Sequence, residues 1–385
     1  MNPLHSLHER ANAEFQGYAE VPIVSTFGQP QAEYAAIRKA AALFDQPYRG
    51  VLELTGKDRL PFLNNLLTNA IYDKQAKSGL APHGGVYAFF LNVKGRIAAD
   101  MNVLELGNRT WLELDRRMID PVRQMFQKYL FAEQVSMNSR AEVLHELFLT
   151  GPKALEVLNS VLESPIAELP SLSSAEAKFR SQAIVVFRDD PCGVPGYTLI
   201  VPNDAAEAIW THLTAEPSDQ TSTKTSGNGS EPQDYRFKGL ARPVGWAAFN
   251  ATRIEAGRPL FGIDFDESVL PAETAQLSRA VSFTKGCYLG QEIVARMQAR
   301  GQLARQLTGI KMEGDALPMA GNKIYDADQN EIGGITSSTL SPILSNLAIC
   351  LGYVKKPFLT PGTRVHVPAE GALRIGTVTE LPFIS

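Results

Sequence analysis

Cysteine is scarce in this chain of 385 residues, which has only Cys192, Cys287 and Cys350. They lie far apart and never form a Cys-x-x-Cys pair, so the sequence supports neither a disulfide framework nor a cysteine-based zinc site. The six histidines show no metal-ligand spacing, apart from the pair His5 and His8 near the start. We therefore predict no metal site and a reducing compartment.

Long hydrophobic runs and strong charge are also missing. No stretch approaches the roughly 18 apolar residues of a membrane span, and the first ten residues lack the apolar core of a signal peptide. The formal net charge is -4, and no block of lysine and arginine indicates a phosphate-binding surface. These absences predict a cytoplasmic protein that binds neither membranes nor nucleic acid.

Several familiar catalytic and nucleotide-binding motifs are absent as well. The chain has no Gly-x-Gly-x-x-Gly after a strand, no P-loop, no His-Glu-x-x-His and no Gly-x-Ser-x-Gly. Dinucleotide binding, zinc peptidase activity and serine hydrolase activity are therefore not predicted.

The composition, 44% hydrophobic and 20% charged, is typical of a globular chain long enough for two or three domains. Alternating apolar residues predict an antiparallel meander over residues 86–115, and helical spacing predicts helices over 31–43, 57–67 and 204–213. The polar tract 215–234 predicts a mobile loop. Six short segments rich in β-formers after residue 301 predict a separate barrel.

The most informative segment is residues 285–292, with the sequence KGCYLGQE. Residues 291–300 have the pattern of an amphipathic helix, which places Cys287 just ahead of a helix N-terminus. Unpaired N–H groups, the helix dipole and the ammonium group of Lys285 would favour a thiolate there. A reactive cysteine is one interpretation, and a small, buried, inert side chain, the usual state of a free cysteine, is the other.

Two carboxylates are candidates for ligand binding. Asp100 lies within a predicted strand, on the same face as Asn102, where a carboxylate is uncommon unless it faces water or a partner. Glu255 lies between two arginines, Arg253 and Arg258. Each carboxylate is either a pocket group that binds an amine or N–H group, or an ordinary solvent-facing or ion-paired side chain.

The segment 277–292, which contains KGCYLGQE, resembles the signature of the YgfZ folate-binding proteins. These are relatives of the glycine cleavage system T protein and of a mitochondrial iron–sulfur assembly factor. The likeness extends over nearly the whole chain, through segments that resemble shared family motifs: 32–45 (AEYAAIRKAAALFD), 54–69 (LTGKDRLPFLNNLLTN), 91–103 (LNVKGRIAADMNV), 253–264 (RIEAGRPLFGID) and 332–342 (IGGITSSTLSP).

The resemblance implies an α+β fold with a T-protein-like folate-binding domain, a ferredoxin-like unit and a C-terminal β-barrel. Residues 1–140 and 237–300 would form the two parts of the folate-binding domain. Residues 141–236 would form the ferredoxin-like unit that contains the loop, and residues 301–385 the barrel.

The resemblance also implies tetrahydrofolate, or a derivative of it, as the cofactor. Asp100 matches the aspartate that contacts the amine region of tetrahydrofolate in T protein. Glu255 matches the glutamate of an Arg-x-Glu-x-Gly motif that looks like a ligand for the pterin ring edge, and Arg253 of the same motif is a further candidate contact. Asn69 matches a family Thr-Asn pair, and Tyr197 falls near a family pocket aromatic.

Our main hypothesis from the sequence is a tetrahydrofolate-binding protein that acts in the assembly or repair of iron–sulfur clusters. Cys287 would be the working thiolate, Lys285 and Asp100 are the other catalytic candidates, and Asp100 with Glu255 would anchor the folate. The assembly machinery or client iron–sulfur proteins would be the partners. The first alternative is a tetrahydrofolate-dependent aminomethyltransferase or demethylase, although Ala70 stands where T protein usually has an aspartate. The second is a non-enzymatic carrier or scaffold in which Cys287 ligates a cluster between two chains.

Overall fold

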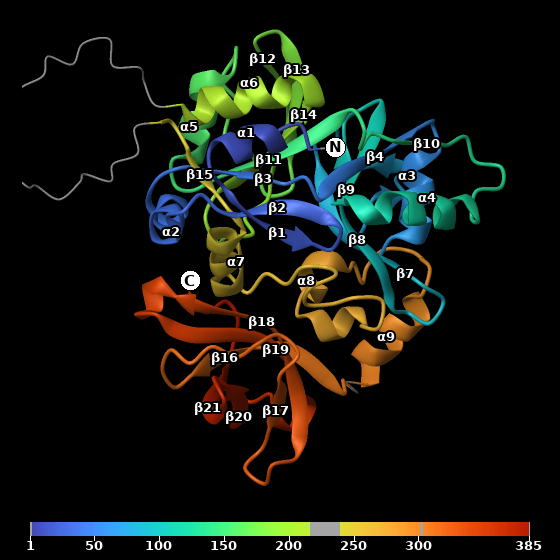
Figure 1. Ribbon diagram of the computed structural model, residues 1–385. Helices are drawn as coiled ribbons and strands as arrows, with labels where there is room; N and C mark the ends of the chain where they lie inside the picture. The colour runs from blue at the N-terminus through green and yellow to red at the C-terminus, as the bar shows by residue number, and fades with distance from the viewer. Residues whose placement is uncertain (1, 216–238, 301–302, 385) are drawn as a thin grey trace, which may run out of the picture.

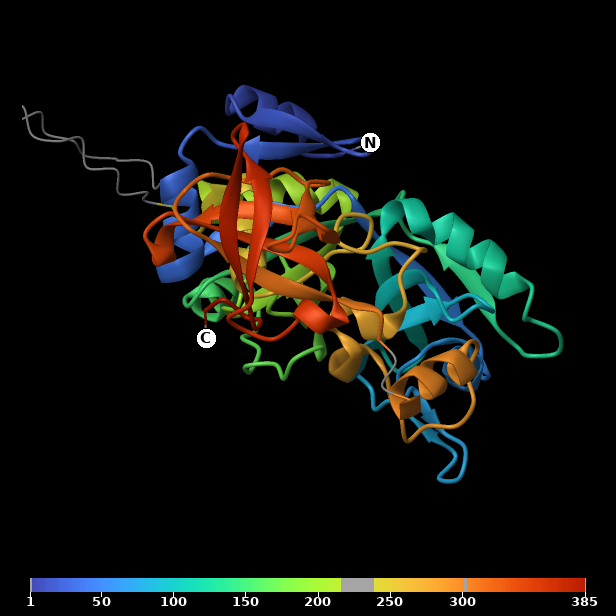
Figure 2. The ribbon, with the colours of Figure 1, turned by 90° about the horizontal axis from the view of Figure 1, so that it is seen from below.

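The computed structural model describes residues 2–215, 239–300 and 303–384. Two β-sheets with their helices make up the upper body in Figure 1, and a barrel, coloured orange to red, lies below them. Figure 2, seen from below, shows the barrel in front of these sheets and α9 (Gln291–Arg300) projecting to one side. The loop expected over 215–234 lies almost entirely outside the described residues.

The first sheet has five strands in the order β10-β4-β9-β8-β7, and all neighbouring strands are antiparallel. It confirms the meander predicted over residues 86–115. Apolar residues of α3 (Arg59–Leu66) and α4 (Ile119–Gln127) pack on one face of this sheet, which leaves the other face for the second sheet. The strands are β4 (Arg49–Thr55), β7 (Gly85–Leu91), β8 (Ile97–Glu105), β9 (Arg109–Asp115) and β10 (Ser136–Ser139).

The second sheet has six strands in the order β12-β13-β14-β11-β3-β15. Strand β3 pairs antiparallel with β11 and parallel with β15. The sheet built mainly from β11 to β14 therefore also includes one strand that precedes them in the chain, β3, and one that follows them, β15. The strands are β3 (Ala42–Asp45), β11 (Leu144–Thr150), β12 (Ser174–Phe179), β13 (Gln182–Arg188), β14 (Gly196–Pro202) and β15 (Arg242–Val244).

The helix predicted over 31–43 is shorter than expected. Helix α2 (Pro30–Lys39) ends before Ala42, and residues 42–45 form β3, in which every residue is buried. A short apolar run that is buried on both faces cannot be distinguished from a buried helix turn by its periodicity, which explains the error. The pairing with β11 decides its structure, because it satisfies the backbone groups of these buried residues.

Further helices and hairpins cover the two sheets. The apolar residues of α5 and α6 pack in one core with β11, β13 and β14, whereas α2 and α7 pack in another core behind β3. The remaining elements before the barrel are α1 (His5–Arg10), β1 (Glu14–Tyr18), β2 (Val21–Thr26), β5 (Tyr72–Asp73), β6 (Ser78–Gly79), α5 (Ala154–Val161), α6 (Asn203–Thr214), α7 (Trp246–Glu255) and α8 (Leu277–Ala280).

The C-terminal segment forms a closed barrel in the order β16-β19-β18-β17-β20-β21, as predicted. Aliphatic side chains such as Ile310, Ile324 and Val365 fill its interior and are fully buried. Together with the mixed helices and sheets, the barrel confirms the α+β class. Its strands are β16 (Arg305–Met312), β17 (Lys323–Tyr325), β18 (Glu331–Ser341), β19 (Leu347–Lys355), β20 (Arg364–Ala369) and β21 (Ala372–Thr379).

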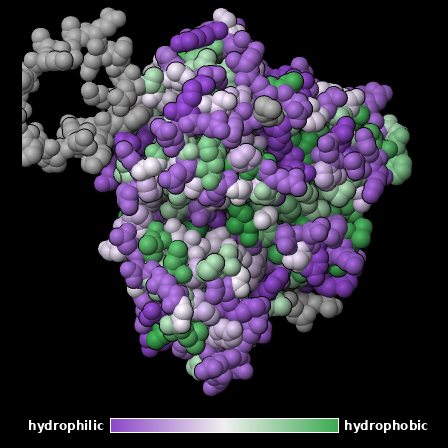
Figure 3. Space-filling model, in the orientation of Figure 1, coloured by the Kyte–Doolittle hydropathy of each residue, from purple (hydrophilic) through white to green (hydrophobic). Residues whose placement is uncertain are grey.

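The face of the molecule in Figure 3 is largely hydrophilic, with apolar residues dispersed among the polar ones. Within the described ranges, no helix combines the length and the apolar character needed to cross a membrane.

Candidate functional site

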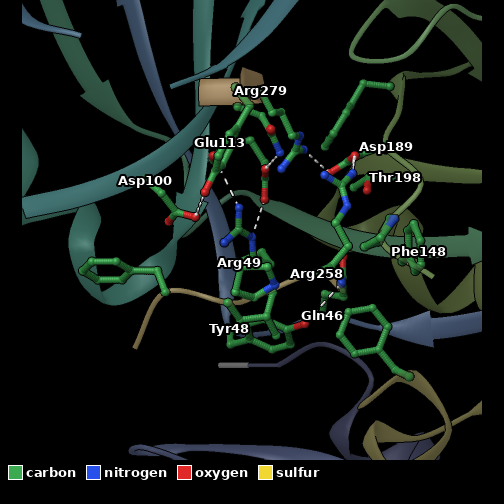
Figure 4. A pocket seen from close by; sticks show the side chains of 18 of the residues that line it. Gln46, Tyr48, Arg49, Asp100, Glu113, Phe148, Asp189, Thr198, Arg258 and Arg279 are labelled. Atoms are coloured by element: carbon green, nitrogen blue, oxygen red, sulfur yellow. Dashed lines mark hydrogen bonds and ion pairs between the residues drawn. The ribbon is translucent and has the colours of Figure 1, made fainter. Parts of the chain in front are cut away.

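A cavity of about 90 Å³ opens where the two sheets face each other. Its walls come from β4, β7, β8 and β9 of the first sheet, from β11, β13 and β14 of the second, and from the segment 258–261 that follows α7. Figure 4 shows charged and aromatic side chains converging on it from both sides. The lining side chains that carry the argument below are Tyr18, Tyr48, Arg49, Tyr87, Asp100, Asn102, Glu113, Phe148, Phe187, Asp189, Thr198, Arg258 and Arg279.

Asp100, in β8, presents a half-buried carboxylate to this cavity. The Tyr87 hydroxyl donates a hydrogen bond of 2.8 Å to Oδ2, whereas Oδ1 is buried and has no partner among the described residues. Burial raises the pKa of Asp100 above its usual value, although Arg49 and the Tyr87 hydrogen bond oppose this shift. A buried carboxylate oxygen without a donor is costly, so this atom is suited to receive an N–H group from a ligand.

Two residues away on the same strand, Asn102 adds a second acceptor. Its Nδ2 donates to Glu113 at 2.7 Å, which leaves its buried Oδ1 without a partner in the described part of the chain. Glu113 in turn accepts a hydrogen bond from Arg49 on β4. The cavity wall thus offers two unfilled oxygen acceptors beside a fixed arginine–glutamate pair.

On the opposite side, Asp189 lies between two arginines. Arg258 donates to one carboxylate oxygen at 2.5 Å, and Arg279 donates to the other at 2.7 Å. Burial alone would raise the pKa of Asp189, but the two arginines hold it below its usual value. Dashed lines in Figure 4 mark these contacts. The Arg279 guanidinium also lies 4.0 Å from the centre of the Tyr87 ring, a cation–π contact.

Aromatic rings complete the lining. Tyr18 and Tyr48 lie with their ring centres 4.5 Å apart, and Phe148 and Phe187 contribute from the second sheet. Such walls suit a flat heteroaromatic ring, and the free oxygens of Asp100 and Asn102 suit N–H groups on the edge of that ring. The donor and acceptor set therefore fits a pterin.

Comparison with known proteins agrees with this architecture. Residues 4–229 match the family model of the GCVT N-terminal domain, and residues 305–384 match that of the glycine cleavage T-protein C-terminal barrel domain. The chain belongs to the glycine cleavage T-protein family. A Chlorobaculum parvum relative named aminomethyltransferase is 30% identical over 387 residues, which cover 99% of this chain and 97% of that protein.

Other similar proteins carry the same name. An aminomethyltransferase of Chlorobium phaeovibrioides is 28% identical over 387 residues, again covering 99% of this chain and 97% of the relative. The crystal structure of glycine cleavage system aminomethyltransferase T from Bartonella henselae superposes with a TM-score of 0.84 at 24% identity, over 99% of this chain and 97% of that one. This likeness shows the T-protein fold. The finer assignment to the YgfZ branch stays a prediction.

Three of the site residues predicted for this T-protein family member, Lys285, Asn69 and Asp100, are connected by a series of hydrogen bonds. Lys285 Nζ donates to the carbonyl oxygen of Asn69 at 2.8 Å. The Asn69 side chain donates to the carbonyls of Tyr87 and Arg279, both at 2.9 Å. Tyr87 then contacts Asp100. Asn69 therefore connects the main chain at two residues of the cavity wall to the KGCYLGQE segment.

The Lys285 side chain is half-buried. It also donates to the carbonyls of Asn64, at 2.7 Å, and of Leu67, at 2.6 Å, at the C-terminal end of α3. Burial and the neighbouring Lys74 lower the pKa of Lys285 to about 7. Cys287, two residues later, is exposed, and α9 begins at Gln291 as predicted. The loop thus presents the thiol to solvent four residues ahead of the helix, so the interpretation of Cys287 as a buried side chain was wrong, and its reactivity stays a prediction.

The other three predicted cofactor contacts lie away from the cavity lining. Glu255 is fully buried and already accepts hydrogen bonds from Tyr34, Arg38 and Ser341. Arg253, also fully buried, pairs with Asp264 and donates to Ser337 of the barrel. These contacts hold α7 against α2 and the barrel. Tyr197 packs in the apolar core behind β14, because strand alternation directs its neighbour Thr198 to the cavity instead.

Sequence reasoning missed the charged partners that surround Asp100. Arg49, Glu113 and Asp189 belong to none of the motifs singled out above, and Arg258 and Arg279 lie within the segments 253–264 and 277–292 but were not assigned to the site. One local signal was available for Glu113: like Asp100, it is a carboxylate within a predicted strand, where such residues are uncommon.

Proposed function

We propose that this protein binds tetrahydrofolate, or a close derivative, in the cavity around Asp100. The observation that carries the proposal is the buried Oδ1 of Asp100, which has no donor within the described residues and faces an aromatic cavity. A reduced pterin offers both a flat pyrimidine ring and the N–H groups that this wall lacks. The family membership supports the same cofactor.

The residues of this chain would have distinct tasks in such a complex. Asp100 and Asn102 would accept N–H groups and fix the orientation of the ring, and Tyr87 would hold the Asp100 carboxylate in place. The arginine pair around Asp189 would bring positive charge to the opposite wall. Bound tetrahydrofolate would supply the carrier for a one-carbon group.

For the reaction, the first candidate is tetrahydrofolate-dependent aminomethyl transfer. Relatives of full length are named aminomethyltransferase, and the cavity keeps a half-buried aspartate with a raised pKa, able to hold or exchange a proton beside the ligand. Asp100 would then act directly on the folate amine region.

The second candidate is assembly or repair of iron–sulfur clusters, with folate bound in the same cavity. It is favoured by one observation, the exposed Cys287 in a loop that Lys285 ties to the end of α3. An exposed thiol in an anchored loop suits contact with a partner protein or transfer of a sulfur-bound group. The two candidates differ in which residue is indispensable.

Folate binding is tested by isothermal titration calorimetry with tetrahydrofolate under anaerobic, reducing conditions. We expect saturable binding that Asp100→Asn weakens by about tenfold or more, because a charge-assisted hydrogen bond contributes roughly 1.5–3 kcal/mol. Asp120→Asn, on the exposed side of α4, is the matched control and should bind like wild type. Absence of binding to wild type, or equal affinity of the Asp100 variant, contradicts the proposal.

Two activity assays then separate the candidates. Aminomethyl transfer predicts turnover with tetrahydrofolate that requires Asp100 and survives Cys287→Ala. Cluster repair predicts reactivation of an oxidatively damaged iron–sulfur enzyme that Cys287→Ala abolishes. Thr284→Ala, an exposed position in the same loop, serves as the control for both assays.

A further inference from the structure

Glu146 is a buried acid next to two residues of the cavity lining, Glu113 and Arg49, and the proposed function does not use it. It lies in β11, two residues before Phe148, so strand alternation directs both side chains toward the cavity side of the sheet. Glu146 is only 1% exposed. Both of its carboxylate oxygens are buried, and neither has a hydrogen-bond partner among the residues that the structure describes.

The charged groups around Glu146 come from the facing sheet. Glu113 of β9 lies beside it, and Arg49 of β4 is the nearby cation. Arg49 already donates to Glu113, and Asn102 donates its N–H to Glu113 as well. The described neighbours therefore give Glu113 two donors and Glu146 none. Burial and the charge of Glu113 both raise the pKa of Glu146 well above its usual value.

An ionised Glu146 would be an unpaired charge in the protein interior next to a second carboxylate, which is among the costliest arrangements in a folded protein. A proton on Glu146 removes that charge. The protonated carboxyl group also becomes a donor, and Glu113 is the acceptor beside it, so one proton satisfies both side chains.

The charge balance of the cavity also favours a protonated, neutral Glu146. The charged residues that line it comprise three carboxylates and three guanidinium groups: Asp100, Glu113, Asp189, Arg49, Arg258 and Arg279. These balance when Glu146, just behind the wall, is neutral. An ionised Glu146 would leave one uncompensated negative charge next to Glu113.

We propose that Glu146 carries a proton at neutral pH and donates it in a hydrogen bond to Glu113, as a positioning residue for the ligand cavity. The hydrogen bond fixes the Glu113 carboxylate as the acceptor for Arg49 and Asn102. Asn102 then keeps its Oδ1 turned away from Glu113 and free for a ligand. The ligand part of this inference rests on the proposed folate binding, whereas the protonation of Glu146 does not.

Infrared spectroscopy of the ligand-free full-length protein at neutral pH tests the protonation. A protonated carboxylic acid has a carbonyl stretch above the amide band, where ionised carboxylates do not absorb. We expect this band in wild type and, at the same intensity, in the exposed control Glu156→Gln, but at clearly lower intensity in Glu146→Gln, where a protonated Asp100 could still absorb. Its absence from wild type, or an unchanged intensity in Glu146→Gln, overturns the proposal.

Isotope labelling gives an answer even if Glu146→Gln fails to fold. In wild type prepared with carboxyl-labelled glutamate, the band should move to lower frequency. A band that does not move belongs to an aspartate such as Asp100 and overturns the assignment to Glu146.

Titration with tetrahydrofolate over a pH series tests the positioning role. Glu146→Gln, which keeps a neutral donor, should bind within about twofold of wild type at neutral pH, a difference well under 1 kcal/mol. Wild type should lose affinity at alkaline pH, where Glu146 ionises and repels Glu113, while the variant should not. Parallel pH profiles for the two proteins refute the positioning role. If wild type binds no folate while the infrared band is present, the proposed function fails and the protonation stands.

Discussion

The anchoring of the KGCYLGQE loop by Lys285 can be tested by Lys285→Met, which keeps an apolar stem of similar length and removes the ammonium group. Three main-chain carbonyls, of Asn64, Leu67 and Asn69, would lose the same donor. At about pH 6, below the pKa of Lys285, the ammonium group is charged, and hydrogen bonds from a charged group contribute roughly 1.5–3 kcal/mol each. Removal of the half-buried ammonium returns part of that as relief of desolvation. We expect a net loss of about 2–4 kcal/mol in the free energy of unfolding.

Urea unfolding measures this loss, and the rate at which a thiol reagent modifies Cys287 measures how firmly the loop is held. The variant should be less stable, and its Cys287 should react at a different rate, because the residues next to it are no longer fixed to the end of α3. Lys94→Met, an exposed lysine in the turn between β7 and β8, should stay within about 0.5 kcal/mol of wild type. The reasoning is refuted if Lys285→Met behaves like Lys94→Met in both assays.

Two other predictions concern buried ionisable side chains, and a third concerns a glycine with a positive φ. Glu146 keeps its proton in the folded state at pH values where a glutamate in the unfolded chain has already lost it, because burial and Glu113 raise its pKa. Wild type should therefore lose stability relative to Glu146→Gln as pH rises above the ordinary pKa of a glutamate, about 4.3, by up to about 1.4 kcal/mol per pH unit in urea titrations, and a constant difference would contradict this. Arg253→Met leaves Asp264 buried without its cation and should cost about 3–5 kcal/mol in thermal or urea unfolding; a loss below about 1 kcal/mol would be inconsistent. Gly290→Ala meets Asn92 and Leu91 at a positive φ of 80° and should lower stability by about 1 kcal/mol or more, whereas unchanged unfolding would show that the loop adapts.

The sheets that the sequence predicted well are those with local pairing. The meander of β7, β8 and β9 has alternating apolar residues and short turns, such as the one at Gly107, so neighbours in sequence are neighbours in space. The barrel follows the same rule with β20 and β21. Strand β3 was misread because its partners, β11 and β15, lie about one hundred and two hundred residues away along the chain.

The residues of the candidate site likewise fall into those that the sequence predicted and those that it did not. Asp100 and Cys287 were found because each is unusual in its local context, a carboxylate inside a strand and a thiol between glycine and a predicted helix. The partners of Asp100 could not be found, because a salt-bridged pair such as Arg258 and Asp189 looks like two unrelated surface residues until the chain folds. Glu255 shows the converse, since its motif suggested a ligand contact while its position at the end of α7 gives its carboxylate three internal partners.

The connection between the cavity and the thiol loop bears on how the two candidate reactions relate. Asn69 holds the main chain at Tyr87 and Arg279, two residues of the cavity wall, while its own carbonyl accepts from Lys285. A ligand that orders the cavity wall therefore acts on the same short segment that anchors the Cys287 loop. Because coupling between sites is reciprocal, a loop held by a partner protein would equally favour the ordered wall. Under the proposed function, bound folate would influence a reaction at the thiol without taking part in it, which would be a physical reason for one chain to carry both features.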